Sequence, residues 1–166
     1  MEKKFDIPFV GLKQGTHEFR FIVGDSFFDS FPFSLIKKGE IHVELMLDKK
    51  ETILIGNFFI RGFVELDCCR CNEIVKAPIE DEMINYYKFG TENEEDENLI
   101  VLPPDEYKIN IAQQVYELIT VSLPVNPKHK KEDCNEEMVT LINKYRNGST
   151  KNENIDPRWE KLNKLN

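Results

Sequence analysis

The sequence predicts an α+β fold in which a curled antiparallel sheet, or a partly open β-barrel, packs with two C-terminal helices. Two long segments, 40–48 and 52–67, alternate between apolar and polar side chains, which is typical of strands that bury one face. A further extended segment follows at 74–89. The two clear stripes of apolar residues at helical spacing come after residue 110, so the helices follow the sheet along the chain.

The chain length of 166 residues suits one well-packed domain. We expect a single α+β domain over 1–147, with a flexible acidic loop at about 90–98. A basic C-terminal tail over 148–166 follows it. Asp156 and Pro157 supply an N-cap and a proline at the first helical position, and they predict a short helix within this tail.

The N-terminal part predicts two strands and a helical turn. Residues 5–10 form the first expected strand, and Pro8 indicates an edge position because proline cannot donate a ladder hydrogen bond. Alternation over 17–23 predicts the second strand. A helical turn over 26–31 follows, capped by Asp25. We expect its aromatic side chains to fill the core: Phe27, Phe28 and Phe31.

The long strands carry the clearest pattern. In 40–48 one face is entirely apolar: Ile41, Val43, Leu45 and Leu47. In 52–67, Gly56 and Gly62 predict bends or bulges that let the strand curl. Within 74–89, Pro78 makes an interior sheet position unfavourable near that residue, and 99–102 is expected to pair only briefly.

Two helices are predicted in the C-terminal half. The first is capped by Asn110, with Gln113 three residues later, and Pro124 ends it. Its apolar stripe is Ile111, Val115, Leu118, Ile119 and Ser122. The second begins at Asp133 and ends at Gly148. We expect its buried face to consist of Met138, Leu141, Ile142 and Tyr145.

The formal net charge of −8 argues against general affinity for nucleic acid, because phosphate binding needs clustered Lys and Arg. The charge is uneven along the chain. The acidic run is Glu92, Glu94, Glu95, Asp96 and Glu97, and the basic run is Lys128, His129, Lys130 and Lys131. These runs predict contact with basic proteins, RNA or both, and ordinary solvated surface is the alternative.

Neither an N-terminal leader nor a long apolar run is present in the sequence. These features predict a soluble cytoplasmic protein with no membrane partner. In a reducing compartment, closely spaced cysteines are metal-binding or catalytic more often than disulfide-bonded.

The main candidate site is a cluster of thiols after the long strand. Cys68 and Cys71 have the CxxC spacing that lets two thiolates reach one ion, while Cys69 between them is expected to point elsewhere. A structural zinc site needs two more ligands, and His129 and Cys134 are the other closely spaced pair. Cys134 is expected at the start of the second helix, where the helix dipole favours a thiolate.

Two other interpretations of the thiols stay open. Cys68 and Cys71 could form a redox dithiol, although the expected sheet lacks the βαβ context of that chemistry. The cysteines could also be packing residues in a metal-free structural adaptor. The sequence contains no GxSxG, HExxH, P-loop or GxGxxG motif, so we expect a protein that is not an enzyme and has no small-molecule substrate.

The order of these motifs resembles the YceD family of large ribosomal RNA subunit accumulation proteins. The matching pieces are Gly62, Cys68-Cys69-Arg70-Cys71, the acidic 92–97, Leu123-Pro124, His129, Cys134 and the closing 156–162. Many members have a cysteine where this chain has His129, an exchange that zinc tolerates. The resemblance implies a ribosome-biogenesis role through large-subunit rRNA, the pre-ribosome or a basic ribosomal protein, and it strengthens the zinc prediction.

Overall fold

The structure is a computed structural model that describes residues 3–90 and 99–147. Its main sheet has five strands in the order β2-β3-β4-β5-β6, and β1 and β7 form a separate pair. The elements in chain order are η1 (Lys3–Phe5), β1 (Asp6–Pro8), β2 (Gly15–Val23), α1 (Asp25–Asp29), β3 (Lys38–Lys49), β4 (Ile53–Asp67), β5 (Ile74–Phe89), β6 (Leu99–Leu102), β7 (Lys108–Asn110), α2 (Ala112–Val121) and α3 (Glu136–Asn147).

The predicted α+β class is confirmed, with a difference in the sheet. β2 to β5 are joined by antiparallel pairing, whereas β6 pairs with β5 in parallel, so the sheet is mixed. It is an open sheet and does not close into a barrel. No helix in the described parts of the chain is both long and apolar enough to cross a bilayer.

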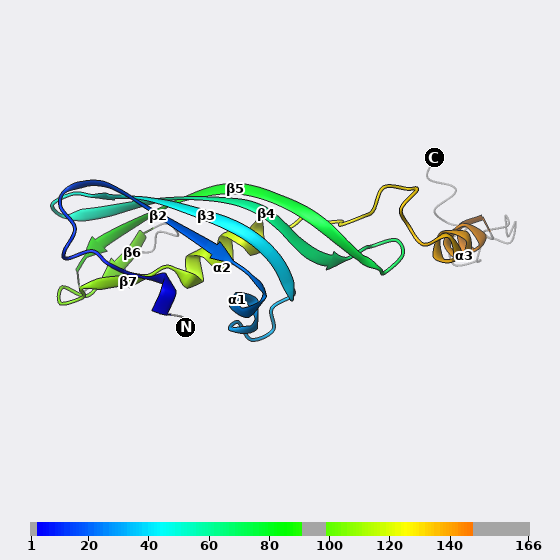
Figure 1. Ribbon diagram of the computed structural model, residues 1–166, viewed down its shortest axis with the longest axis horizontal. Helices are drawn as coiled ribbons and strands as arrows, with labels where there is room; N and C mark the ends of the chain where they lie inside the picture. Colours follow the sequence, from blue (N-terminus) through cyan, green and yellow to red (C-terminus); the bar gives the residue numbers. More distant parts are fainter. Residues whose placement is uncertain (1–2, 91–98, 148–166) are drawn as a thin grey trace, which may run out of the picture.

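One face of the sheet carries the core. The alternate residues of β3 and β4 that were expected to be apolar are buried there, among them Leu45 and Phe58. α1, α2 and the β1–β7 pair lie on this face (Figure 1). The segment just after α1 contacts α2, since the rings of Phe31 and Tyr116 stack with centroids 4.0 Å apart. The phenylalanines predicted as core, Phe27 and Phe28, are buried.

The chain start is tied to the start of α2. Asp6 accepts hydrogen bonds from Lys108 Nζ and Asn110 Nδ2, each at 2.6 Å. Asn110 Oδ1 in turn accepts from the backbone N–H of Ala112 at 3.1 Å. The predicted cap residue thus bonds to the first turn of α2, although Gln113 donates to Glu117 and does not complete a capping box.

The predicted bulges at Gly56 and Gly62 are wrong. The pairing of β4 with β3 and β5 runs through both glycines without an extra residue. A Cβ on Gly62 would collide with the carbonyl oxygen of Glu40, and one on Gly56 would press on Phe58, Leu45 and Tyr87. The glycines therefore allow close packing on the core face rather than a break in the ladder.

Pro78 lies in a part of β5 that has a partner on one side only. It pairs with Phe63 of β4, while β6 reaches only Tyr86–Phe89 on the other side. The expectation that Pro78 avoids an interior sheet position is met, because no described strand requires a hydrogen bond from it on that side.

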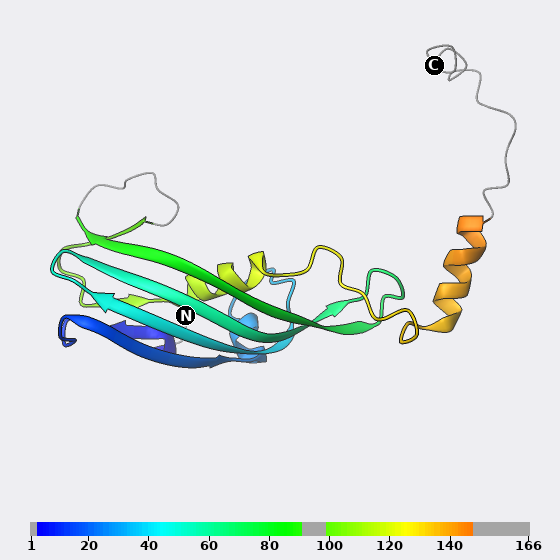
Figure 2. The same cartoon turned by 90° about the horizontal axis from the view of Figure 1, so that it is seen from above.

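The predicted buried face of the second helix is wrong. α3 begins at Glu136 rather than at Asp133, and it stands beyond the end of the β4–β5 hairpin, away from the core (Figure 2). The four side chains that were predicted to be buried are exposed, up to 72% for Tyr145: Met138, Leu141, Ile142 and Tyr145. The acidic run 92–97 and the tail 148–166 lie outside the described residues.

We expect Gly62→Ala to destabilise the fold by about 2 kcal/mol, because the new methyl group must push two strands apart in a well-packed sheet. Gly11→Ala is the matched control, since a Cβ there meets nothing within 4 Å. Urea unfolding of both variants measures the difference. Equal stabilities would show that the β3–β4 ladder yields at Gly62 without cost.

Candidate metal centre

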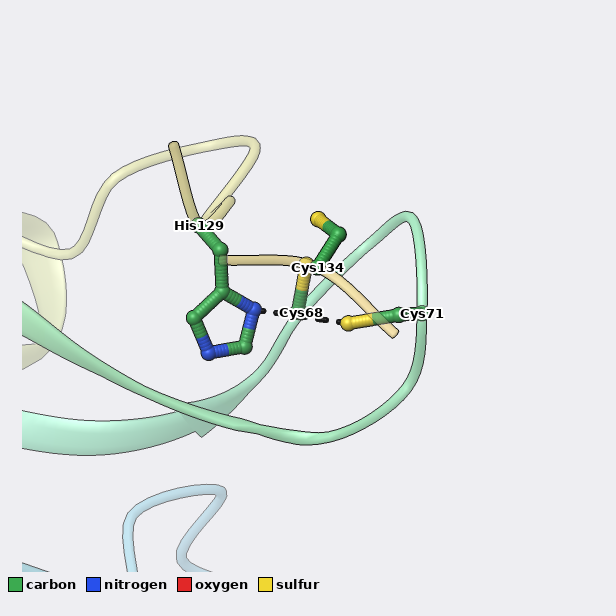
Figure 3. A group of neighbouring side chains, drawn as sticks. All are labelled: Cys68, Cys71, His129 and Cys134. Atoms are coloured by element: carbon green, nitrogen blue, oxygen red, sulfur yellow. Dashed lines mark hydrogen bonds between the residues drawn. The ribbon is translucent and has the colours of Figure 1, made fainter. Parts of the chain in front are cut away.

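The four predicted ligands come together at the far end of the β4–β5 hairpin (Figure 3). Cys68 and Cys71 lie in the turn after β4, and His129 and Cys134 lie in the segment between α2 and α3. Their ligand atoms are all within 4.8 Å of one another. The three cysteine side chains are nearly inaccessible, at 2%, 3% and 5% exposure in chain order.

The turn that holds the first pair is closed by backbone hydrogen bonds. The N–H of Cys68 donates to Glu73 O at 2.9 Å, and the N–H of Asn72 donates to Cys68 O at 2.8 Å. Asn72 has φ of 60°, the left-handed conformation that asparagine tolerates better than most residues. The chain therefore turns back between the end of β4 and the start of β5, and the sulfurs of Cys68 and Cys71 lie on the same side of this turn.

Hydrogen bonds join the segment that carries the second pair to this turn and to the start of β5. The N–H of Cys69 donates to Pro127 O at 2.9 Å. His129 Nε2 lies 3.0 Å from Ile74 O, and Asn135 Nδ2 donates to Glu73 Oε1 at 2.8 Å. The segment before α3 is thus held to the hairpin mainly by polar contacts. Among the described residues, apolar packing on the cysteines is limited to Val75 and Val139.

The imidazole of His129 is oriented as a metal ligand. A carbonyl oxygen can only accept, so Nε2 carries the proton that it donates to Ile74 O. In the neutral ring this leaves the lone pair on Nδ1, which lies 3.4 Å from the sulfur of Cys71. Metal-binding histidines commonly show this pattern, with the distal N–H held by a backbone carbonyl.

The thiols differ in acidity. Burial opposes ionisation of Cys68, but hydrogen bonds from the backbone N–H groups of Cys71, His129 and Arg70 lower its pKa to about 5. Backbone N–H groups of Asn135 and Glu73 lower the pKa of Cys71.

The pKa values of the other two predicted ligands are raised. Burial raises the pKa of Cys134. Hydrogen bonds to the sulfurs of Cys68 and Cys71 raise the pKa of His129. Cys134 lies two residues before α3 rather than at its start, and the net shift of its pKa is upward, opposite to the expected direction.

Sequence reasoning missed two residues that support the cluster. Arg70 Nη1 donates to the sulfur of Cys134 at 3.4 Å, and its backbone N–H lies 3.5 Å from the sulfur of Cys68. Asn135 caps α3, since its Oδ1 accepts from the N–H of Met138 at 3.2 Å. An arginine inside the CxxC motif and an asparagine directly after Cys134 were the available signals.

The donor set suits a tetrahedral ion. A metal–sulfur bond of about 2.3 Å places two sulfurs of such a site about 3.8 Å apart, which fits within the 4.8 Å that encloses all four ligand atoms. Three thiolates with one imidazole are a common structural set for soft and borderline ions. The Arg70 guanidinium faces the excess negative charge that three thiolates bring. These four side chains could therefore hold one metal ion.

The remaining predicted site residues are only partly placed. Lys128, Lys130 and Lys131 are exposed around the cluster. The acidic residues proposed for partner binding, 92–97, are outside the described ranges. Cys69 is exposed, as its position between the two ligands predicts.

Both halves of the cluster fall within one family match. The family model described as "Large ribosomal RNA subunit accumulation protein YceD" matches residues 56–166, which is more than half of the chain. No curated protein matches the chain, and no solved structure does.

Titration of the metal-free chain with cobalt(II) tests the four donors. We expect one ion per chain with the absorption of a tetrahedral thiolate site, lost in Cys71→Ser and kept in the matched control Cys69→Ser. Because the raised pKa of Cys134 keeps its proton on at neutral pH, binding releases protons. Affinity should fall about tenfold per pH unit for each proton released as the pH is lowered. Equal behaviour of the two variants would contradict the assignment.

Proposed function

The chain belongs to the YceD family, and on that premise we propose that it is a ribosome-biogenesis factor rather than an enzyme. It supports the accumulation or processing of large-subunit rRNA in the cytoplasm, through binding. The observation that carries the proposal is the family match over 56–166, which contains all four members of the cluster.

We further propose that the ion is zinc and that its role is structural. When bound, zinc supplies a cross-link between the β4–β5 hairpin and the segment before α3. The residues present favour this role: the three sulfurs are buried, and His129 Nε2 is already bonded to a backbone carbonyl. The cluster then holds the β4–β5 hairpin and the segment before α3 together, and recognition falls to charged surface around it.

One observation favours a second candidate, a thiol oxidoreductase. The pKa of Cys68, lowered to about 5, would make it a thiolate at neutral pH, as redox cysteines require. Access argues against it, because an attacking thiolate must reach its substrate and Cys68 is 2% exposed. A metal-free chain that exchanges disulfides rapidly would favour the enzyme.

A basic ribosomal protein is the favoured partner. The net charge of −8 attracts a cationic protein and repels phosphate except near Lys128, Lys130 and Lys131. Electrostatic complementarity of this kind raises the association rate and is weakened by salt. RNA contact, where it occurs, falls to that basic segment.

Removal of the metal should release α3 while the sheet core stays folded. Val139 is the only α3 side chain that packs on the cluster in the described chain, and an isolated helix of this length is marginal in water. We expect amide hydrogen exchange to show loss of protection in α3 after chelation or in Cys134→Ser. Protection in β3 and β4 should persist, as it should throughout Cys69→Ser. Uniform unfolding of core and helix would contradict a local cross-link.

Two measurements test the function. A strain without the gene should accumulate less large-subunit rRNA relative to small-subunit rRNA, and restoring the gene should correct the ratio. The immobilised chain should retain basic proteins extracted from purified large subunits at low salt and lose them steeply as salt is added. An unchanged rRNA ratio, or retention that ignores salt, would count against the proposal.

A further inference from the structure

The face of the sheet opposite the core is uncovered by any helix or strand of the described residues (Figure 1). The long strands present their other set of alternate side chains there. In the middle of this face, Glu44 of β3, Phe59 of β4 and Glu82 of β5 lie directly opposite one another in register. Side chains so paired have Cβ atoms about 4.5–5.5 Å apart. A phenylalanine ring therefore stands between two carboxylates.

The ring is open to solvent. Phe59 is 42% exposed, and it borders a shallow hollow of roughly 510 Å³ on this face. The hollow is lined chiefly by His42, Glu44, Phe59, Arg61, Glu80 and Glu82. The next row along the strands brings together Met46, Asn57 and Ile84, and Met46 and Ile84 are also exposed. Exposed apolar side chains gathered in adjacent rows among charged ones are typical of an interaction site.

The charges on this face are incompletely balanced. Arg61 lies 3.9 Å from Glu80, and Arg20 lies 3.2 Å from Glu44 at the sheet edge. Both pairs are exposed, so they are weak and readily exchanged. Glu82 forms no ion pair with any described residue, which leaves the surroundings of Phe59 acidic.

This combination suits a Lys or Arg side chain. The face of an aromatic ring attracts a cation, and carboxylates on either side add direct ion pairs with it. The aliphatic stem of the same side chain covers the ring. An RNA phosphate meets the opposite conditions here, since Glu44 and Glu82 repel it.

We propose that this outer sheet face is the docking site for a Lys/Arg-rich segment of a basic protein, with one cationic side chain over Phe59 between Glu44 and Glu82. The neighbouring row of Met46 and Ile84 takes an apolar side chain of the same segment. The inference deepens the proposed function, on which it rests for the identity of the partner as a ribosomal protein.

Fluorescence binding at low salt tests the site with defined probes and the full chain purified without chelator. The probe is a labelled peptide of alternating arginine and alanine. Its citrulline counterpart keeps the shape and removes the charge, and a labelled single-stranded RNA is the nucleic-acid arm.

Peptide affinity should fall about fivefold in Phe59→Ala and about tenfold in Glu44→Gln/Glu82→Gln. The citrulline peptide should not bind the wild-type chain. This comparison tests the need for positive charge without any substitution in the protein.

Matched controls separate this face from general charge. Phe33→Ala removes a phenylalanine that is 99% exposed elsewhere, and Glu51→Gln/Asp105→Asn removes two exposed carboxylates away from the face. Both should change peptide affinity less than about twofold. Equal losses in control and face variants, no binding of the arginine peptide, or RNA binding that the face variants abolish would each overturn the inference.

The inference and the proposed function can fail separately. An unchanged rRNA ratio in the strain without the gene removes the function while the peptide result stands. A reduced ratio together with peptide binding that ignores Glu44 and Glu82 removes the docking site alone.

Discussion

The unbroken pairing of β3, β4 and β5 is the constraint on which the rest of the structure depends. Because the register continues through every residue of these strands, each side chain is assigned to one face by its parity alone. One parity builds the core, and the other builds the exposed face around Phe59. A single bulge would move every side chain beyond it to the opposite face of the sheet. The ladder has no bulge at Gly56 or Gly62, where the missing Cβ allows close packing instead.

The hairpin extends past the region that the core supports, and this explains the cluster at its end. Among the residues that the structure describes, the apolar neighbours packed with the cysteine cluster are Val75 and Val139, too few to order the long segment after α2 by burial. Polar contacts and ligand bonds act over short distances and need little surface. The metal cross-link that we propose would order a region that hydrophobic packing cannot.

Sequence patterns located the strands and the two halves of the candidate site because each depends on local spacing. Alternation predicted which side of 40–48 is buried, and CxxC spacing predicted the paired sulfurs of Cys68 and Cys71. The buried face of α3 was mispredicted because amphipathicity says which side is apolar and not whether the chain folds back to cover it. The parallel pairing of β6 depends on the path of the chain after β5, which no local pattern records. Phe59, an exposed aromatic residue on the solvent-facing parity of its strand, is the sequence signal for the docking face that we propose.

The distribution of charge decides how the two kinds of partner can be engaged. Lys128, Lys130 and Lys131 can neutralise about three phosphates, which supports only weak, salt-sensitive RNA contact. The sheet face instead joins exposed apolar rings with carboxylates, a combination that gains from both burial and charge when a cationic protein segment binds. If the proposed partners are correct, a basic protein binds the sheet face and RNA contact is confined to the segment at the cluster, so the proposed role of the cluster is to position those lysines rather than to react.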